Sequence, residues 1–161
     1  MLFADGSAAA LITHDQYPVP GLELQHFYAE IIPRGKKDMA WELSSSGFLM
    51  TLSGYIPELI KEDFGPLIGR ALESAGITKK QVTGWCIHPG GKRILDAVKK
   101  SLELDADALI QSTHILEQFG NMSSPTILYV LKQMMNRNYK KILGAAFGPG
   151  LTMETFVGEI R

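Results

Sequence analysis

The sequence Gly84-Trp85-Cys86-Ile87-His88-Pro89-Gly90-Gly91 joins a short apolar run to a glycine-rich turn. The run from Val82 to Ile87 predicts a strand, because it is short, mostly apolar and bounded by turn residues. After the turn, apolar residues return at helical spacing, at Ile94, Leu95, Val98 and Leu102. A strand, a glycine turn and a helix in this order are typical of a layered α/β domain. His88 stands where the strand ends.

Upstream of this unit, the pattern predicts a strand, a hairpin and a helix. The strand spans Phe27 to Ile32, which are mostly aromatic or branched residues. The apolar runs Trp41 to Leu43 and Phe48 to Leu52 flank a serine-glycine turn and predict the hairpin. From Pro57, apolar residues recur at helical spacing until Gly76, which is placed as a helix stop.

Downstream, two helices and two strands are expected. The first helix spans Ser112 to Phe119, and the second begins at Pro125, a residue favoured in a first helical turn. The strands Ile142 to Phe147 and Leu151 to Val157 are joined by a Gly-Pro-Gly turn. The predicted buried side of the second helix comprises Ile127, Leu128, Val130, Leu131, Met134 and Met135. No internal repeat interrupts the pattern, so we expect one layered α/β domain with a mixed sheet.

Composition excludes several classes of function. The 161 residues are 45% hydrophobic and 20% charged, as in one globular domain with a sizeable core. The formal net charge is -1, from 16 basic and 17 acidic residues, so no nucleic-acid partner is expected. The single cysteine, Cys86, excludes a disulfide within the chain. There is no secretory signal and no apolar run of membrane length, so we expect a cytoplasmic protein without membrane contact and without a metal site.

The opening residues, Leu2 to Ile12, read as an apolar strand that contains an Asp5-Gly6 turn. Natural amino termini more often begin with a few polar residues. This start is therefore typical of the middle of a longer chain, and we expect either an expressed fragment or a split gene.

Three loops place an unusual residue at the end of an element: His88, Asn121 and the turn Gly148-Pro149-Gly150. Each signal is weak alone. A lone histidine is more often structural than catalytic, an asparagine can simply cap local backbone, and a Gly-Pro-Gly turn is usually just a hairpin. Only the combination points to a site.

The combination resembles the motifs of one enzyme family. Residues 84–91, with Ile94-Leu95-Asp96-Ala97, are similar to the histidine motif of chalcone and stilbene synthase-like enzymes, the type III polyketide synthases. Gly120-Asn121-Met122-Ser123-Ser124 resembles their asparagine motif, and residues 147–154 resemble their C-terminal signature. Segments 2–10 and 47–60 are similar too. The likeness runs from end to end, over the C-terminal half of a family whose chains are about twice as long.

The resemblance implies a thiolase-like fold, in which two related α/β halves enclose the active site, with residues 1–161 as the C-terminal domain. It implies an acyltransferase that extends an acyl-CoA starter with malonyl-CoA by decarboxylative Claisen condensation, without a bound cofactor. The family uses a Cys-His-Asn triad. His88 would supply the imidazole that stabilises a thiolate, and Asn121 an amide donor to the thioester oxygen. Both side chains are expected to converge on one cavity.

One triad member is missing from these residues. The family's nucleophilic cysteine belongs to the N-terminal half, so this chain alone is expected to be inactive. Cys86 lies two residues before His88, and alternation along a strand puts both on one face. We interpret Cys86 as a structural, buried thiol.

Six further residues align with the family's pocket and are expected to bind substrate: Phe3, Phe48, Ser123, Phe147, Gly148 and Pro149. Phe3 and Phe48 match the two aromatic residues that gate the elongation cavity. The alternative is that both are ordinary core residues of strands. Ala4 stands where the family often has glycine.

Two other functions compete with this hypothesis. A ketoacyl carrier-protein synthase of the third type shares the fold and the His/Asn pair, but there a glutamine-containing segment typically follows the histidine, in place of Pro89-Gly90-Gly91. A non-catalytic binding module is suggested by the missing nucleophile. Whichever of these functions is correct, the absence of the N-terminal half would expose an apolar face. We therefore expect a homo-oligomer.

Overall fold

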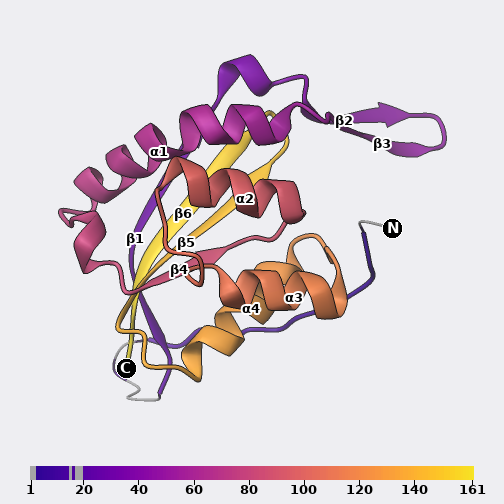
Figure 1. Cartoon of the computed structure of the whole chain (residues 1–161). Coiled ribbons are helices and arrows are strands. Elements are labelled where there is room, and N and C mark those ends of the chain that lie inside the picture. Colours follow the sequence, from indigo (N-terminus) through magenta and orange to yellow (C-terminus); the bar gives the residue numbers. More distant parts are fainter. Residues whose placement is uncertain (1–2, 15, 17–19) are drawn as a thin grey trace.

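The computed structural model describes residues 3–14, 16 and 20–161. Its centre is a four-stranded mixed sheet in the order β1-β6-β5-β4 (Figure 1). The strands are β1 (Leu22–Ile31), β4 (Gly84–Ile87), β5 (Lys141–Gly148) and β6 (Thr152–Ile160). β6 runs antiparallel to both of its neighbours, whereas β4 and β5 are parallel. Parallel pairing requires a long crossover, and three helices supply it.

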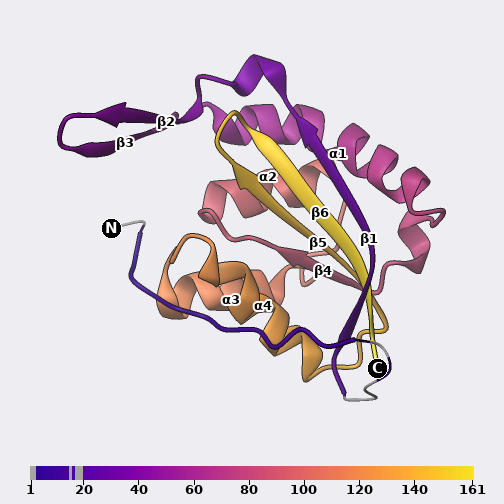
Figure 2. The same cartoon turned by 180° about the vertical axis from the view of Figure 1, so that it is seen from behind.

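Helices cover both faces of the sheet, as the two opposite views show (Figures 1 and 2). α1 (Ile56–Ser74) and α2 (Lys92–Ser101) lie on one face, and α3 (Ile110–Phe119) and α4 (Pro125–Met135) lie on the other. Successive side chains of β4 point to opposite faces of the sheet, so they pack alternately under the two pairs of helices. Trp85 and Ile87 join the core under α1 and α2, while Cys86 joins the core under α4. The predicted layered α/β domain with a mixed sheet is confirmed.

α1 and α2 are in close contact where α1 contains a proline. Pro66 has no N–H and cannot donate a hydrogen bond within the helix. Just before it, the N–H of Gly65 donates to Ser101 Oγ, at 2.8 Å. A Cβ on Gly65 would lie 2.7 Å from the Ser101 carbonyl oxygen, so the approach requires glycine here. This contact holds the end of α2, the helix that follows the His88 turn.

The hairpin of β2 (Met39–Ser44) and β3 (Gly47–Leu52) projects from the body of the molecule (Figures 1 and 2). Its register is antiparallel, and Gly47 adopts the positive φ of 126° that the tight turn needs. At its base, Gly150 N donates to Met39 O at 2.6 Å, which ties the hairpin to the β5–β6 turn. The predicted hairpin is confirmed.

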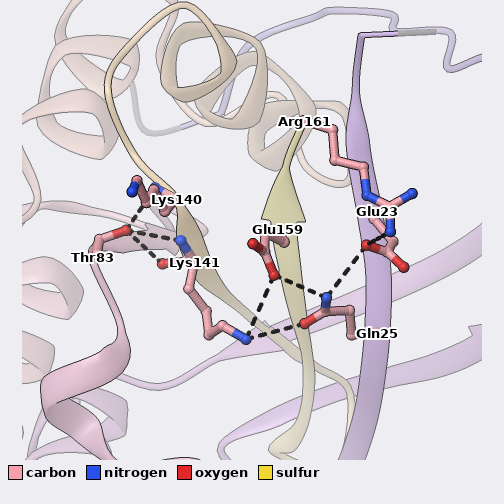
Figure 3. A network of polar contacts seen from close by, with 7 residues as sticks. All are labelled: Glu23, Gln25, Thr83, Lys140, Lys141, Glu159 and Arg161. Carbon is pink, nitrogen blue, oxygen red and sulfur yellow. Dashed lines mark hydrogen bonds and ion pairs between the residues drawn. The ribbon is translucent and has the colours of Figure 1, made fainter. Parts of the chain in front are cut away.

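A polar network ties together the end of the sheet at which β4 and β5 begin (Figure 3). Thr83 Oγ1 donates to Lys141 O and accepts from the N–H groups of Lys140 and Lys141. Beyond it, Gln25 Nε2 donates to Glu159 Oε2 at 3.1 Å. The network comprises Glu23, Gln25, Thr83, Lys140, Lys141, Glu159 and Arg161. His88 and Gly148 lie at the opposite end, so the network leaves that end free for a site.

Two predictions of local structure are wrong. Residues 4–14 form no strand of either sheet, and among them Leu11 and Ile12 are 90% and 83% exposed; Leu2 lies outside the described residues. An apolar run predicts a strand, but pairing needs a neighbouring edge, and this segment lies beside helix α4 instead (Figure 2). In α4, Leu128 and Met135 are exposed. The buried stripe is narrower than predicted and consists of Thr126, Val130 and Met134.

No helix in the described part of the chain is long and apolar enough to cross a membrane.

Candidate active site

His88 is held by the sheet. Its N–H donates to Ala145 O at 2.9 Å, which continues the β4–β5 ladder one residue past β4. The chain then turns at once, because Gly90 N donates back to His88 O at 3.0 Å. α2 begins two residues later, at Lys92. The strand therefore fixes the backbone of His88, and the turn leaves the His88 side chain at the carboxyl end of β4.

The His88 imidazole is mostly buried, and it makes no side-chain hydrogen bond to any described residue. Burial lowers the pKa of His88 from 6.5 to about 4, because a buried imidazolium loses its hydration. At neutral pH the ring is therefore uncharged, and one of its nitrogens is a free proton acceptor.

Asn121 lies just after α3, where Gly120 adopts a positive φ of 71° and ends the helix. Its side chain is bonded at both ends. Nδ2 donates to Gly90 O at 3.2 Å, and Oδ1 accepts from Ser123 N at 2.9 Å. Asn121 is only 4% exposed, so these bonds fix the direction of its amide. The second hydrogen on Nδ2 is available to another acceptor.

Gly90 brings the two predicted catalytic residues to one turn. Asn121 bonds its carbonyl oxygen, and the position of a Cβ on Gly90 would be 3.8 Å from His88 Cδ2. The imidazole and the amide thus flank the same residue. That both act on one substrate remains a prediction. Two hollows on the described surface, of about 390 and 200 Å³, are lined by neither His88 nor Asn121.

Two buried hydroxyls, neither of them predicted from the sequence, support this arrangement. Thr126 Oγ1 accepts from Met122 N at 2.9 Å and donates to Ser123 O at 2.7 Å, which fixes the turn that carries Asn121. Ser112 Oγ donates to Ile87 O at 2.6 Å, next to His88. A signal existed for Thr126, because it is the polar member of the buried stripe of α4.

Of the predicted pocket residues, Phe3 and Ser123 lie beside Asn121. Phe3 forms an isolated parallel bridge with Asn121, and Ala4 N donates to Asn121 O at 2.9 Å. Ser123 is exposed and adopts a positive φ of 63°, which the turn imposes on it. Phe3 is 37% exposed, so the core interpretation is wrong for this residue.

Phe48 lies on β3 of the projecting hairpin, and the β5–β6 turn lies at the base of that hairpin. Phe48 is 71% exposed, and its ring meets that of Trp41 edge-on with ring centroids 6.0 Å apart, so it is not a core residue either. Phe147 is partly buried and packs on Phe64, with ring centroids 5.4 Å apart. Gly148 follows it, and Pro149 is exposed. No bond among described residues joins Phe48 to Asn121.

Cys86 is unsuited to nucleophilic attack. It is fully buried, and burial raises the pKa of its thiol from 9.0 to about 12. Its only polar neighbour within the described residues is Ile127 O, 3.8 Å from Sγ. Since the thiolate is the reactive form, Cys86 is inert at neutral pH, as the sequence analysis expected of a structural thiol.

The buried His88 should make the fold less stable in acid. The unfolded chain takes up a proton on this histidine near pH 6.5, whereas the folded chain does so only near pH 4. The free energy of unfolding therefore keeps its full contribution from the neutral ring above pH 6.5. It falls by about 3 kcal/mol as the pH decreases from 6.5 to about 4. Urea unfolding at a series of pH values measures this loss.

The control is His88→Gln, which keeps a neutral polar side chain and should flatten the pH dependence between pH 6.5 and 4. A His88 ring whose NMR signal titrates near pH 6.5 in the folded chain would contradict the prediction.

The fold, with His88 and Asn121 on two turns that meet at Gly90, defines the class of this protein: a thiolase-like half, with helices on both faces of a mixed sheet. The family follows from comparison. Residues 23–160 match the model of the chalcone and stilbene synthases, C-terminal domain, and the chain belongs to this family.

Solved structures share the fold. PKS-I from the brown alga Ectocarpus siliculosus has a TM-score of 0.83 and 23% identity, over 91% of this chain and 41% of its own. A type III pentaketide synthase from Neurospora crassa has a TM-score of 0.79 and 24% identity, over 92% of this chain and 43% of its own. 1,3,6,8-Tetrahydroxynaphthalene synthase from Streptomyces coelicolor has a TM-score of 0.80 and 25% identity, over 88% of this chain and 42% of its own. The chain thus spans less than half the length of each of these three proteins.

Proposed function

We propose that this chain is the C-terminal domain, residues 1–161, of a type III polyketide synthase that condenses malonyl-CoA onto an acyl-CoA starter with loss of carbon dioxide. One observation supports the proposal above all. In a chain of this family, the imidazole of His88 and the fixed amide of Asn121 flank the same residue, Gly90. The proposed substrates are coenzyme A thioesters, and no bound cofactor is needed.

Asn121 supplies an oxyanion donor in this mechanism. Decarboxylation of a malonyl thioester breaks the bond to the carboxylate carbon and leaves the electron pair on an enolate, whose charge rests on the thioester oxygen. A donor fixed before the reaction stabilises that charge without reorganisation. Asn121 Nδ2 has one hydrogen held by Gly90 O and a second one free.

His88 supplies a second donor and a partner for the nucleophile. The uncharged ring accepts a proton from a cysteine thiol, and the resulting imidazolium stabilises the thiolate. A thiolate beside the ring also raises the pKa of His88, which opposes the effect of burial. The low pKa of His88 in this chain is therefore what we expect of a site without the anionic cysteine thiolate beside the ring.

The nucleophile comes, in this proposal, from a cysteine-bearing half that packs beside His88 and Asn121. Cys86 is inert, so the 161 residues alone would be inactive. Phe3, Ser123, Phe147, Gly148 and Pro149 would line the chamber between the halves, with Phe48 at its rim. The alternative of a non-catalytic binding module rests on the same inert Cys86, and only an experiment separates the two functions.

The test is covalent loading. Incubated with an acyl-CoA, the 161-residue chain should gain no acyl mass, because thiolate capture needs a cysteine that this chain does not provide. Joined to the cysteine-bearing half of a type III polyketide synthase, the same residues should support loading and release carbon dioxide from malonyl-CoA. Intact-mass spectrometry and a carbon dioxide assay give the two readouts.

Cys86→Ser is the matched control, and it should change neither result. A stable acyl adduct on Cys86 would overturn the assignment of an inert thiol. A joined protein that binds acyl-CoA but never decarboxylates malonyl-CoA would favour the binding module.

We further propose that the chain self-associates. Large apolar side chains are exposed in numbers that a monomer rarely tolerates, and several of them follow one strand, β1, and the hairpin. Those residues are Leu24, Phe27, Ile31, Trp41, Leu43, Phe48, Leu49, Met50 and Leu52. A second copy could cover this surface in a two-fold dimer.

Sedimentation velocity at several concentrations should therefore show a shift from monomer to dimer. Phe27→Asp is expected to weaken the association, since it places a charge on the exposed face of β1 without touching the core. A single monomeric species across the whole concentration range would contradict self-association.

A further inference from the structure

A polar hollow of about 390 Å³ lies between the start of α3 and the end of α4. It is separate from the candidate active site. α4 begins beside the Asn121 turn and is 11 residues long, so its far end lies about 16 Å along the helix from that turn. The volume is in the range of small-molecule sites. The hollow is lined by Ile110, Gln111, His114, Gln133, Asn136 and Arg137.

The lining carries positive charge and hydrogen-bond donors. Arg137 forms no ion pair with any residue that the structure describes, although it lies at the hollow. His114, Gln133 and Asn136 likewise make no side-chain hydrogen bond within the described chain. No carboxylate of a described residue lines the hollow. An unneutralised guanidinium with amide donors around it favours an anionic ligand.

Gln111 is the second, independent observation. It is only 5% exposed, and its Oε1 accepts from Tyr139 OH at 3.1 Å. Its Nε2 has no partner among the described residues. Since no fully buried side-chain nitrogen or oxygen lacks a partner, Nε2 must reach the surface, and Gln111 lines the hollow there. Tyr139 thus orients a buried amide so that its N–H groups face the hollow.

Helix dipoles do not produce this preference. The positive end of α3 and the negative end of α4 both face the hollow, so their partial charges oppose each other. The charge of the site therefore comes from Arg137.

The second hollow, of about 200 Å³ between α1 and α2, has a different character. Its cations Lys61, Arg93 and Lys100 share it with two carboxylates, Glu58 and Asp96. Lys61 pairs with Glu58 at 3.8 Å, so this hollow neutralises part of its own charge. The contrast singles out the hollow at Arg137.

We propose that the hollow at Arg137 binds a small anionic molecule that carries a phosphate or a carboxylate group. The Arg137 guanidinium pairs with the anion, and the Gln111 amide donates a hydrogen bond to it. The remaining volume is larger than one anion needs, so the ligand has a polar body that meets Gln133 and Asn136. This site is independent of the proposed condensation reaction.

The test is titration of the 161-residue chain, followed by two-dimensional NMR, with inorganic phosphate in one series and succinate in another. Sodium chloride at equal ionic strength is the reference. Saturable shifts should appear at the Gln111 side-chain amide and at Arg137, and not with chloride. A response to phosphate alone identifies a phosphate ester as the ligand class, and a response to succinate alone identifies a carboxylate.

Three variants complete the test. Arg137→Gln should weaken binding by about tenfold or more, because it removes a charge-assisted pair. Gln111→Glu, which keeps the shape and repels the anion, should abolish binding. Arg93→Gln removes an exposed arginine at the other hollow and should leave the affinity unchanged. No saturable shift with either anion, equal shifts with chloride, or equal weakening by Arg137→Gln and Arg93→Gln would each overturn the proposal.

Discussion

Replacement of Asn121 by alanine, in a protein that joins this chain to a cysteine-bearing half, is expected to slow the decarboxylation of malonyl-CoA by about 10²- to 10³-fold. The amide is fixed by Gly90 O and by Ser123 N, so it meets the developing enolate charge without first having to turn. Since this charge exists only near the transition state, kcat should fall while KM changes little. Steady-state kinetics with malonyl-CoA separate the two constants.

Asn138→Ala is the matched control, because it removes the same amide from an exposed turn after α4. It should leave both constants unchanged. Circular dichroism and thermal unfolding check that Asn121→Ala still folds, since this variant also loses two internal hydrogen bonds. A folded Asn121→Ala protein with the original kcat would remove Asn121 from the mechanism.

The second large effect is on stability. Phe64→Ala should lower the free energy of unfolding by about 3–5 kcal/mol, because it empties a fully buried site in the core under α1. Phe64 also packs on Phe147, the residue that leads into the β5–β6 turn. The loss therefore affects the part of the fold that carries the proposed pocket wall. Urea unfolding at neutral pH measures it.

The same substitution at Phe48 is the comparison. Phe48 is 71% exposed on the hairpin, so Phe48→Ala should change stability by no more than about 0.5 kcal/mol. A loss at Phe48 as large as that at Phe64 would restore the interpretation of Phe48 as a core residue.

Local sequence pattern predicted most of the fold, and physical reasons explain where it succeeded. The strand that leads to His88, the two final strands and the β2–β3 hairpin have apolar runs bounded by glycine or proline, and such boundaries are local properties of the chain. Helix starts at Pro57 and Pro125 were similarly marked, and the structure places α1 and α4 within one residue of them.

The misses concern contacts that no local pattern contains. Residues 4–14 have the composition of a strand, but no sheet edge lies beside them in this chain. Leu128 and Met135 have helical spacing, but they stay 36% and 37% exposed in the described structure. In both cases an apolar pattern states that a residue prefers burial. It does not state which surface is available to bury it.

For the candidate site, the motifs identified His88 and Asn121 but not what holds them. Gly90 lies between the two, since its carbonyl oxygen accepts from Asn121 Nδ2 and its N–H donates to His88 O, and Thr126 fixes the Asn121 turn from inside α4. Neither side-chain contact follows from spacing, since the partners are 31 and 4 residues apart and the first crosses the whole of α2 and α3. The hollow at Arg137 was missed because Gln111, Tyr139 and Arg137 form no recognisable motif.

The two parts of the proposed pocket differ in how readily they should unfold locally. One contains His88, whose N–H donates to Ala145 O, and the other is the β2–β3 hairpin, which projects from the body of the molecule (Figure 1). His88 belongs to the central ladder, whose amides are released to solvent only by large, slow openings. β3 of the hairpin is exposed along its whole length, and we expect its backbone amides to be accessible through small, fast openings. In the proposed function, we expect an aromatic rim on this hairpin to adjust on a short timescale to acyl chains of different size. We expect the imidazole and the amide to keep their positions meanwhile, because His88 is held by the central ladder and the Asn121 amide by two hydrogen bonds.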